Sequence, residues 1–101
     1  MPQLIIEQPG VPPRSVALTG EELHLGRAED NTVALVADEV SRHHAKVVRR
    51  TAGFVLVDLN SLNGTYVNRT LIDGEVALRD SDEVQIGKFR LVYMVASSGR
   101  P

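Results

Sequence analysis

Residues 46–58 read KVVRRTAGFVLVD, and this stretch decides the fold class of the chain. Two runs rich in valine and other strand-forming residues, 46–50 and 54–58, flank the turn Thr51-Ala52-Gly53. Such residues favour half-buried β-strands, and a short turn containing glycine between two of them is typical of a hairpin. The segment therefore predicts two antiparallel strands joined by a tight connection.

The rest of the chain repeats this pattern of short apolar runs separated by turn residues. Further strands are expected at residues 4–7, 15–18, 22–26, 32–35, 65–67, 70–72, 74–78, 83–86 and 89–95, with a loop at 8–13. No apolar residues recur at helical spacing over ten positions without a breaker, although residues 35–41 could hold a short turn of helix. A spacing of about 8–12 residues between turns indicates an all-β sandwich or barrel.

Composition limits the size of the domain and its partners. With 101 residues and 43% apolar content, the chain has room for one ordinary globular core. We expect a domain over residues 1–96 and a flexible tail or linker stub over 97–101. The net charge of −2 gives no bulk attraction to nucleic acid or to a membrane. The absence of cysteine, of a signal peptide and of a membrane span fits a cytoplasmic protein.

The sequence offers little to support catalysis. Its histidines are His24, His43 and His44, and the last two are adjacent, so in an extended segment they point to opposite faces. No nucleophile elbow surrounds Ser41, and neither a P-loop nor a dinucleotide fingerprint occurs. We expect no enzyme activity, no metal site and no cofactor.

Polar residues instead gather in loops between the expected strands. They form three groups: Gly26-Arg27, then Ser41-Arg42-His43-His44, then residues 61–68 with Asn63-Gly64 at their centre. The ordered series Gly-Arg, Ser-Arg-x-His and Asn-Gly resembles the signature of the forkhead-associated (FHA) family. The resemblance extends over residues 4–95, and the order of the three motifs carries more weight than any one of them.

The resemblance implies a fold and a ligand. Members of this family are eleven-stranded β-sandwiches whose loops at one end bind a phosphothreonine peptide. Carried over to this sequence, Arg27 and Ser41 contact the phosphate, Arg42 is placed to help, the backbone N–H of Leu62 reaches the phosphate, and Asn63 pairs with the peptide backbone. These residue types suit an anion with about −1.5 to −2 charges, because arginine donates several charged hydrogen bonds.

Three further residues are implied to support the site from behind: Gly26, His44 and Gly64. Several site residues also have a simpler interpretation: Arg27 as a solvated arginine after a strand, Ser41-Arg42 as ordinary loop polarity, and Asn63-Gly64 as common hairpin chemistry. A histidine in the place of His44 is more often structural than ligand-binding, which agrees with the implied supporting role. His24 and His43 are interpreted as surface residues or as histidines whose hydrogen bonds are satisfied.

Two positions depart from the family pattern. Leu62 occupies a place where threonine is frequent, so its side chain offers the phosphate no hydroxyl. Arg69 follows Asn68 where glycine is frequent, which affects a turn more than the site.

The implied function is reversible, phosphorylation-dependent protein binding in signal transduction, downstream of a Ser/Thr kinase. The partners would be phosphothreonine-containing protein segments, belonging to such a kinase or to its substrates. The alternative is a structural or assembly module on the same fold that binds unphosphorylated protein surfaces. The combination of Arg27 with Ser41 argues against that alternative, since a scaffold has no need of both.

Overall fold

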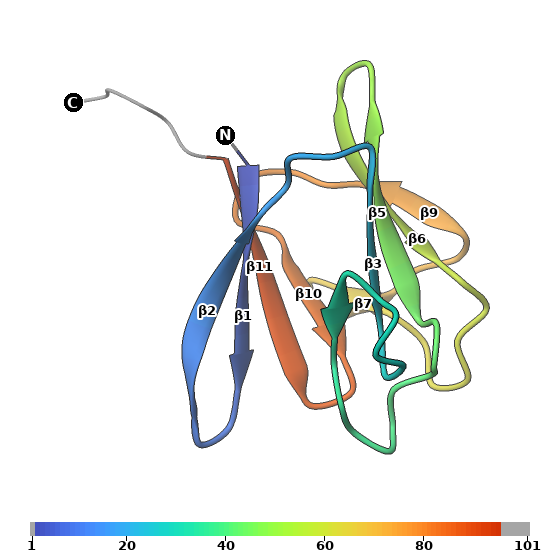
Figure 1. Cartoon of the computed structure of the whole chain (residues 1–101). Helices are drawn as coiled ribbons and strands as arrows, with labels where there is room; N and C mark the ends of the chain where they lie inside the picture. The colour runs from blue at the N-terminus through green and yellow to red at the C-terminus, as the bar shows by residue number, and fades with distance from the viewer. Residues whose placement is uncertain (1, 96–101) are drawn as a thin grey trace.

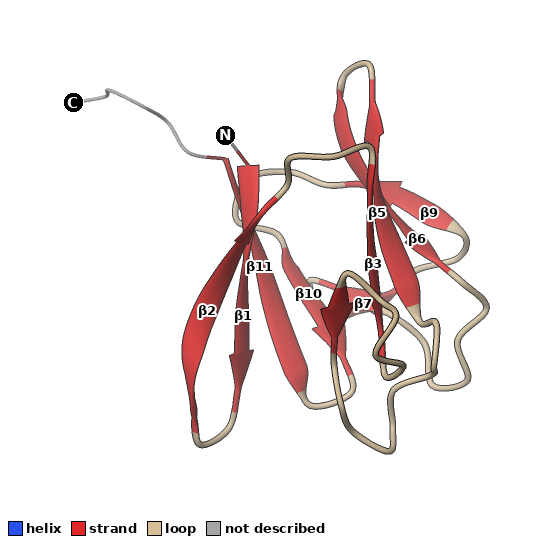
Figure 2. Ribbon diagram, in the orientation of Figure 1, coloured by secondary structure: helices blue, strands red, loops and turns tan. Residues whose placement is uncertain are grey.

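A computed structural model describes residues 2–95 of the chain. Within this range the protein is all-β, as predicted, and Figures 1 and 2 show its strands and loops. The strands are β1 (Pro2–Gln8), β2 (Val11–Ala17), β3 (Glu22–Gly26), β4 (Val33–Ala34), β5 (Ala45–Arg50), β6 (Gly53–Asp58), β7 (Tyr66–Val67), β8 (Thr70–Leu71), β9 (Glu75–Ala77), β10 (Glu83–Ile86) and β11 (Phe89–Val95). The expected tail at 97–101 lies outside the described residues.

The strands form two sheets that face each other. One sheet has the order β2-β1-β11-β10-β7-β8, and the other has the order β4-β3-β5-β6-β9. All neighbours pair antiparallel except β3 and β4, which are parallel. The hairpin expected from residues 46–58 is β5–β6, with Val47 opposite Leu56. The prediction of an eleven-stranded sandwich is therefore confirmed.

The core lies between the sheets and follows from strand alternation. In β10, Val84 and Ile86 are buried while Glu83 and Gln85 are exposed, which is the period-two pattern of a sheet with one wet face. Phe54 of β6 and Tyr93 of β11 meet edge to face across the interior, with ring centroids 6.4 Å apart. This contact joins the two sheets directly.

Two details differ from the sequence-based expectation. The loop predicted at 8–13 is wrong: β1 and β2 are joined by a turn at Pro9-Gly10, and Pro12 and Pro13 belong to β2. Prolines are tolerated there because β2 is an edge strand, whose outward side needs no hydrogen-bond donors. Residues 35–41 contain no helix, only turns such as the one closed by the Val40 N–H on the Ala37 carbonyl.

The fold gives the molecule two different ends. The loops after β3, before β5 and after β6 lie at the lower end in Figure 1. The first and last described strands run side by side, with Pro2 opposite Val95, at the upper end. The polar motifs found in the sequence therefore gather away from the points where the described chain enters and leaves.

Candidate functional site

The first loop junction joins the end of β3 to residues 41–44. The Arg27 N–H donates to the Ser41 carbonyl at 2.9 Å, and the Ala28 N–H donates to the Arg42 carbonyl at 3.1 Å. These bonds bring the two backbones so close that a Cβ added at Gly26 would lie 2.2 Å from the Arg42 oxygen. Only glycine fits at position 26, and this close approach fixes Arg27 beside Ser41.

Asn31 locks the same junction from the side, and the sequence motifs did not single it out. Its side chain is buried, and its Nδ2 donates to the carbonyls of Ala28 at 2.7 Å and Arg42 at 2.8 Å. A turn asparagine of this kind signals side-chain bonding to nearby backbone, but the distant partner Arg42 depends on the fold.

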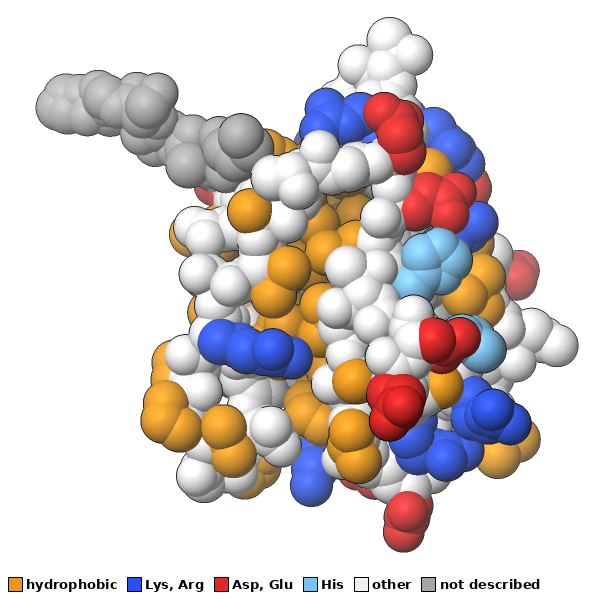
Figure 3. Space-filling view, in the orientation of Figure 1, with side chains coloured by type: hydrophobic (Ala, Val, Ile, Leu, Met, Phe, Trp, Pro, Cys, Tyr) orange, Lys and Arg blue, Asp and Glu red, His pale blue; other side chains and the backbone are white. Residues whose placement is uncertain are grey.

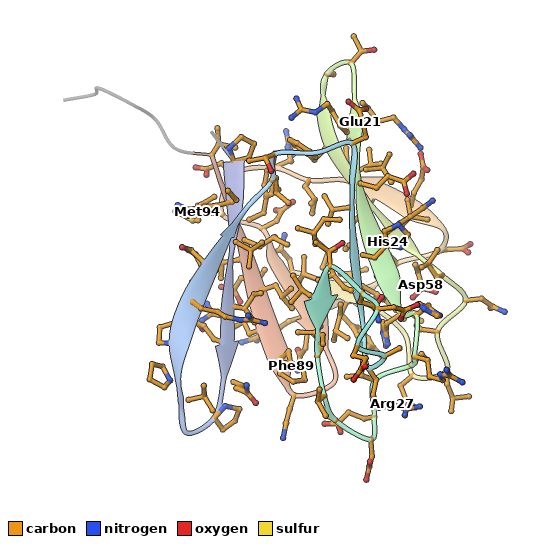
Figure 4. The ribbon with its side chains drawn as sticks, viewed as in Figure 1. Glu21, His24, Arg27, Asp58, Phe89 and Met94 are labelled. Atoms are coloured by element: carbon orange, nitrogen blue, oxygen red, sulfur yellow. The ribbon has the colours of Figure 1, made fainter. Side chains whose placement is uncertain are left out.

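Arg27, Ser41 and Arg42 present their polar groups at this end. The Arg27 Nε donates to the Val40 carbonyl at 3.0 Å, which holds the guanidinium while its terminal nitrogens make no ion pair within residues 2–95. The Ser41 Oγ accepts the Leu62 N–H at 3.0 Å and keeps its own O–H available to donate. Arg42 is exposed beside them. Figure 4 labels Arg27 at the lower end of the ribbon, and Figure 3 shows Lys and Arg gathered there beside acidic side chains.

The loop that follows β6 is organised by one carboxylate, which the motifs also did not reveal. Asp58 accepts hydrogen bonds from the hydroxyls of Ser61 at 2.6 Å and Thr65 at 2.7 Å, and from the Ser61 N–H at 3.2 Å. The Ser61 Oγ in turn accepts the Gly64 N–H at 3.1 Å. Burial raises the pKa of Asp58, but the hydrogen bonds from Ser61 and Thr65 outweigh it and leave that pKa below its ordinary value.

His44 connects these loops from the inside. It is fully buried, its Nδ1 accepts the Ser41 N–H at 3.0 Å, and its Nε2 lies 2.9 Å from the Gly64 carbonyl, to which it donates. An acceptor at Nδ1 and a donor at Nε2 require the neutral imidazole. The ring stands behind Ser41, with its polar atoms committed to backbone groups of two loops.

Asn63 and Gly64 shape the rim of the third loop. The Asn63 Nδ2 donates to the Glu39 carbonyl at 2.8 Å, so one amide hydrogen and the Oδ1 remain for a ligand. Gly64 has a φ of +89°, a conformation in which glycine is favoured, and a Cβ there would meet the Leu71 side chain at 2.6 Å. Leu62, between Ser61 and Asn63, is 89% exposed.

The fold brings the implied contact residues to one end, and the side chains of the other two histidines are paired with carboxylates. His24 pairs with Glu22 at 3.0 Å, and His43 pairs with Asp30 at 3.2 Å. No group of three metal-ligating side chains occurs in the described part of the chain. The exposed groups suit an anion held by arginine and hydroxyl donors.

A family model for the FHA domain matches residues 23–87. The chain belongs to the FHA domain family. An FHA domain is a binding module, so the expectation that this chain is not an enzyme is confirmed. Residues 2–95 contain no helix that could span a membrane.

Curated relatives of this FHA domain are bacterial regulators. The chain is 51% identical over 69 residues to an oxoglutarate dehydrogenase inhibitor of Corynebacterium diphtheriae, covering 68% of this chain and 48% of that protein. It is equally similar to the glycogen accumulation regulator GarA of Mycolicibacterium smegmatis, of which it covers 43%. The chain thus spans less than half the length of either relative.

Solved structures share the fold of this FHA domain. Mycobacterium tuberculosis EmbR in complex with a low-affinity phosphopeptide superposes with a TM-score of 0.84 at 27% identity, covering 98% of this chain and 26% of that one. The FhaA FHA domain complexed with the intracellular domain of Rv3910 gives a TM-score of 0.78 at 28% identity, covering 89% and 98%.

Proposed function

We propose that this FHA domain binds phosphothreonine-containing segments of partner proteins through Arg27, Ser41, Arg42 and the Leu62 N–H. The observation that carries the proposal is the central position of Ser41. Its carbonyl accepts the Arg27 N–H at 2.9 Å, and its hydroxyl accepts the Leu62 N–H at 3.0 Å. One residue thus links the two loops that supply the other donors.

The physical argument rests on preorganisation. Arg27 is held by its Nε on the Val40 carbonyl, so less side-chain freedom is lost when its terminal nitrogens bind a phosphate. A doubly charged phosphate can replace the Ser41 oxygen as acceptor for the Leu62 N–H, while the Ser41 hydroxyl turns to donate. Charge-assisted bonds of this kind are shorter and stronger than neutral ones.

The supporting residues have separate roles in this proposal. Gly26 allows the loops to approach, His44 holds Ser41 to Gly64, and Asn63 binds the peptide backbone with its remaining amide groups. No cofactor takes part.

The relatives support this function and extend it. The EmbR structure contains a phosphopeptide, and the FhaA domain is complexed with an intracellular protein domain. We propose that the present domain likewise acts in the cytoplasm, downstream of a Ser/Thr kinase, on the kinase or its substrates. The names of the curated relatives associate the same module with regulators of metabolism.

Isothermal titration against a phosphothreonine peptide library tests the proposal. A peptide that binds should lose affinity on dephosphorylation, and Arg27→Ala should weaken binding about tenfold to a hundredfold, the value of one charge-assisted hydrogen bond. Arg50→Ala is the matched control, because Arg50 is an exposed arginine on the β5–β6 hairpin, paired with Glu75. Equal binding of the dephosphorylated peptide would favour the assembly module that binds unphosphorylated surfaces.

A further inference from the structure

Leu62 is the most exposed large apolar residue in the described part of the chain, at 89%. Single exposed leucines are ordinary on protein surfaces, so exposure alone carries no argument. The position of Leu62 does carry an argument, because its backbone N–H lies 3.0 Å from the Ser41 Oγ and the next residue in the sequence is Asn63. The most exposed large apolar side chain therefore stands next to the groups proposed to bind phosphate.

The loop that carries Leu62 is held in place on both sides. Asp58 accepts hydrogen bonds from Ser61 on the N-terminal side, and the Gly64 N–H returns to the Ser61 Oγ on the C-terminal side. A large apolar side chain on a fixed loop loses little backbone entropy when a ligand covers it, so more of the burial energy is available for binding.

We propose that Leu62 is a specificity-determining residue that selects ligands with a large aliphatic or aromatic side chain one or two positions from the phosphothreonine. The inference rests on the proposed function of the site. An extended peptide advances about 3.3 Å per residue, so such neighbours start within roughly 7 Å of the phosphothreonine. The Leu62 N–H lies 3.0 Å from the Ser41 Oγ, so we place its side chain next to these neighbours of the phosphothreonine.

The chemistry of this position favours an apolar neighbour in two ways. Leucine offers the phosphate no hydroxyl, so its side chain contributes only by contact with apolar atoms. A charged peptide residue packed against it would lose hydration without gaining a partner. Phosphate recognition and neighbour recognition therefore fall to different atoms of the same residue, the backbone N–H and the side chain.

Fluorescence anisotropy with labelled phosphothreonine peptides separates the two contributions. Each of the positions −2, −1, +1 and +2 is varied in turn among Leu, Phe, Ala, Asp and Lys. We expect the native domain to prefer Leu or Phe over Asp or Lys about tenfold at one or more of these positions, in line with the burial of one apolar side chain. In Leu62→Ala, which shortens the apolar side chain without adding a hydroxyl that could reach the phosphate, that preference should fall to less than about twofold.

Val36→Ala is the matched control, since Val36 is 70% exposed but belongs to a separate groove with Val11 and Phe89. It should keep the full preference, and melting curves should show all three proteins equally folded. A native domain that binds phosphopeptides without preferring apolar neighbours, or a preference that survives in Leu62→Ala, overturns the inference. If no phosphopeptide binds at all, the proposed function itself fails, and this inference fails with it.

Discussion

Replacement of His44 by alanine tests how the binding loops are held together. The imidazole is fully buried, accepts the Ser41 N–H at 3.0 Å and donates to the Gly64 carbonyl at 2.9 Å. His44→Ala removes both partners at once and leaves a cavity beneath two loops. We therefore expect the free energy of unfolding to fall, with the loops loosened as a consequence.

The expected magnitude follows from these contacts. A backbone group left without its partner costs about 1–3 kcal/mol when buried. Ser41 and Gly64 are partly exposed, so water recovers part of each bond, and about 1 kcal/mol for each group is appropriate. The lost packing of the ring adds about 2 kcal/mol, the lower end for large-to-small core substitutions. The total, about 4 kcal/mol, corresponds to a melting temperature lower by roughly 15–30 °C for a domain of this size.

Thermal melting followed by circular dichroism measures the effect. The adjacent His43→Ala is the control, because His43 is exposed and bonds only to Asp30 within the described residues, at 3.2 Å. Its free energy of unfolding should change by less than about 0.5 kcal/mol. A His44→Ala protein that melts with the native one yet binds no phosphopeptide would refute the reasoning and make His44 a direct ligand contact.

Further predictions concern the backbone and the carboxylate that shape the loops. Gly26→Ala should destabilise the domain by about 2–3 kcal/mol in denaturant titrations, because its Cβ would meet the Arg42 carbonyl oxygen. Arg69→Gly should stabilise it by about 0.5–1 kcal/mol in the same assay, because Arg69 has a φ of +71° that costs a non-glycine residue energy. Asp58 has a pKa below its ordinary value. Its ionised carboxylate therefore stabilises the folded domain at pH values above that ordinary pKa, and this stabilisation is lost as the pH falls through the lowered pKa. Melting curves from pH 7 down to about pH 2 should show the loss in the native protein and a smaller one in Asp58→Asn.

The sequence predicted the strands correctly where the local pattern of apolar and polar residues indicates which side chains are buried. Alternation in residues 83–86 and the valine-rich arms of 46–58 both specify strands with one buried face. Prolines at 12 and 13 misled the interpretation, because proline marks a loop unless the strand lies at a sheet edge, and edge position is a property of the whole sheet.

The contact residues of the site could be predicted from short sequence motifs, but the long-range contacts that hold its loops in place could not. Gly26-Arg27, Ser41-Arg42 and Asn63-Gly64 are short patterns, and the fold brings them to one end of the sandwich. The lock between Asn31 and the Arg42 carbonyl joins residues eleven positions apart, and the bond from Asn63 to Glu39 spans 24. Such contacts depend on how two loops lie against each other, which residue spacing does not encode.

The pairing of Pro2 with Val95 has a practical consequence for how this domain can be joined to other polypeptides. Directly opposed residues of antiparallel strands have Cα atoms about 5 Å apart, so other polypeptides could be joined to this domain at two adjacent points. A reporter protein attached near Pro2 or Val95 would lie on the opposite side of the domain from the loops that carry Arg27 and Ser41. The domain could equally be spliced into an exposed loop of an unrelated host, which would need to open by only that distance. In such a fusion the binding loops would remain exposed to the ligand, and the host protein would provide the signal that reports binding.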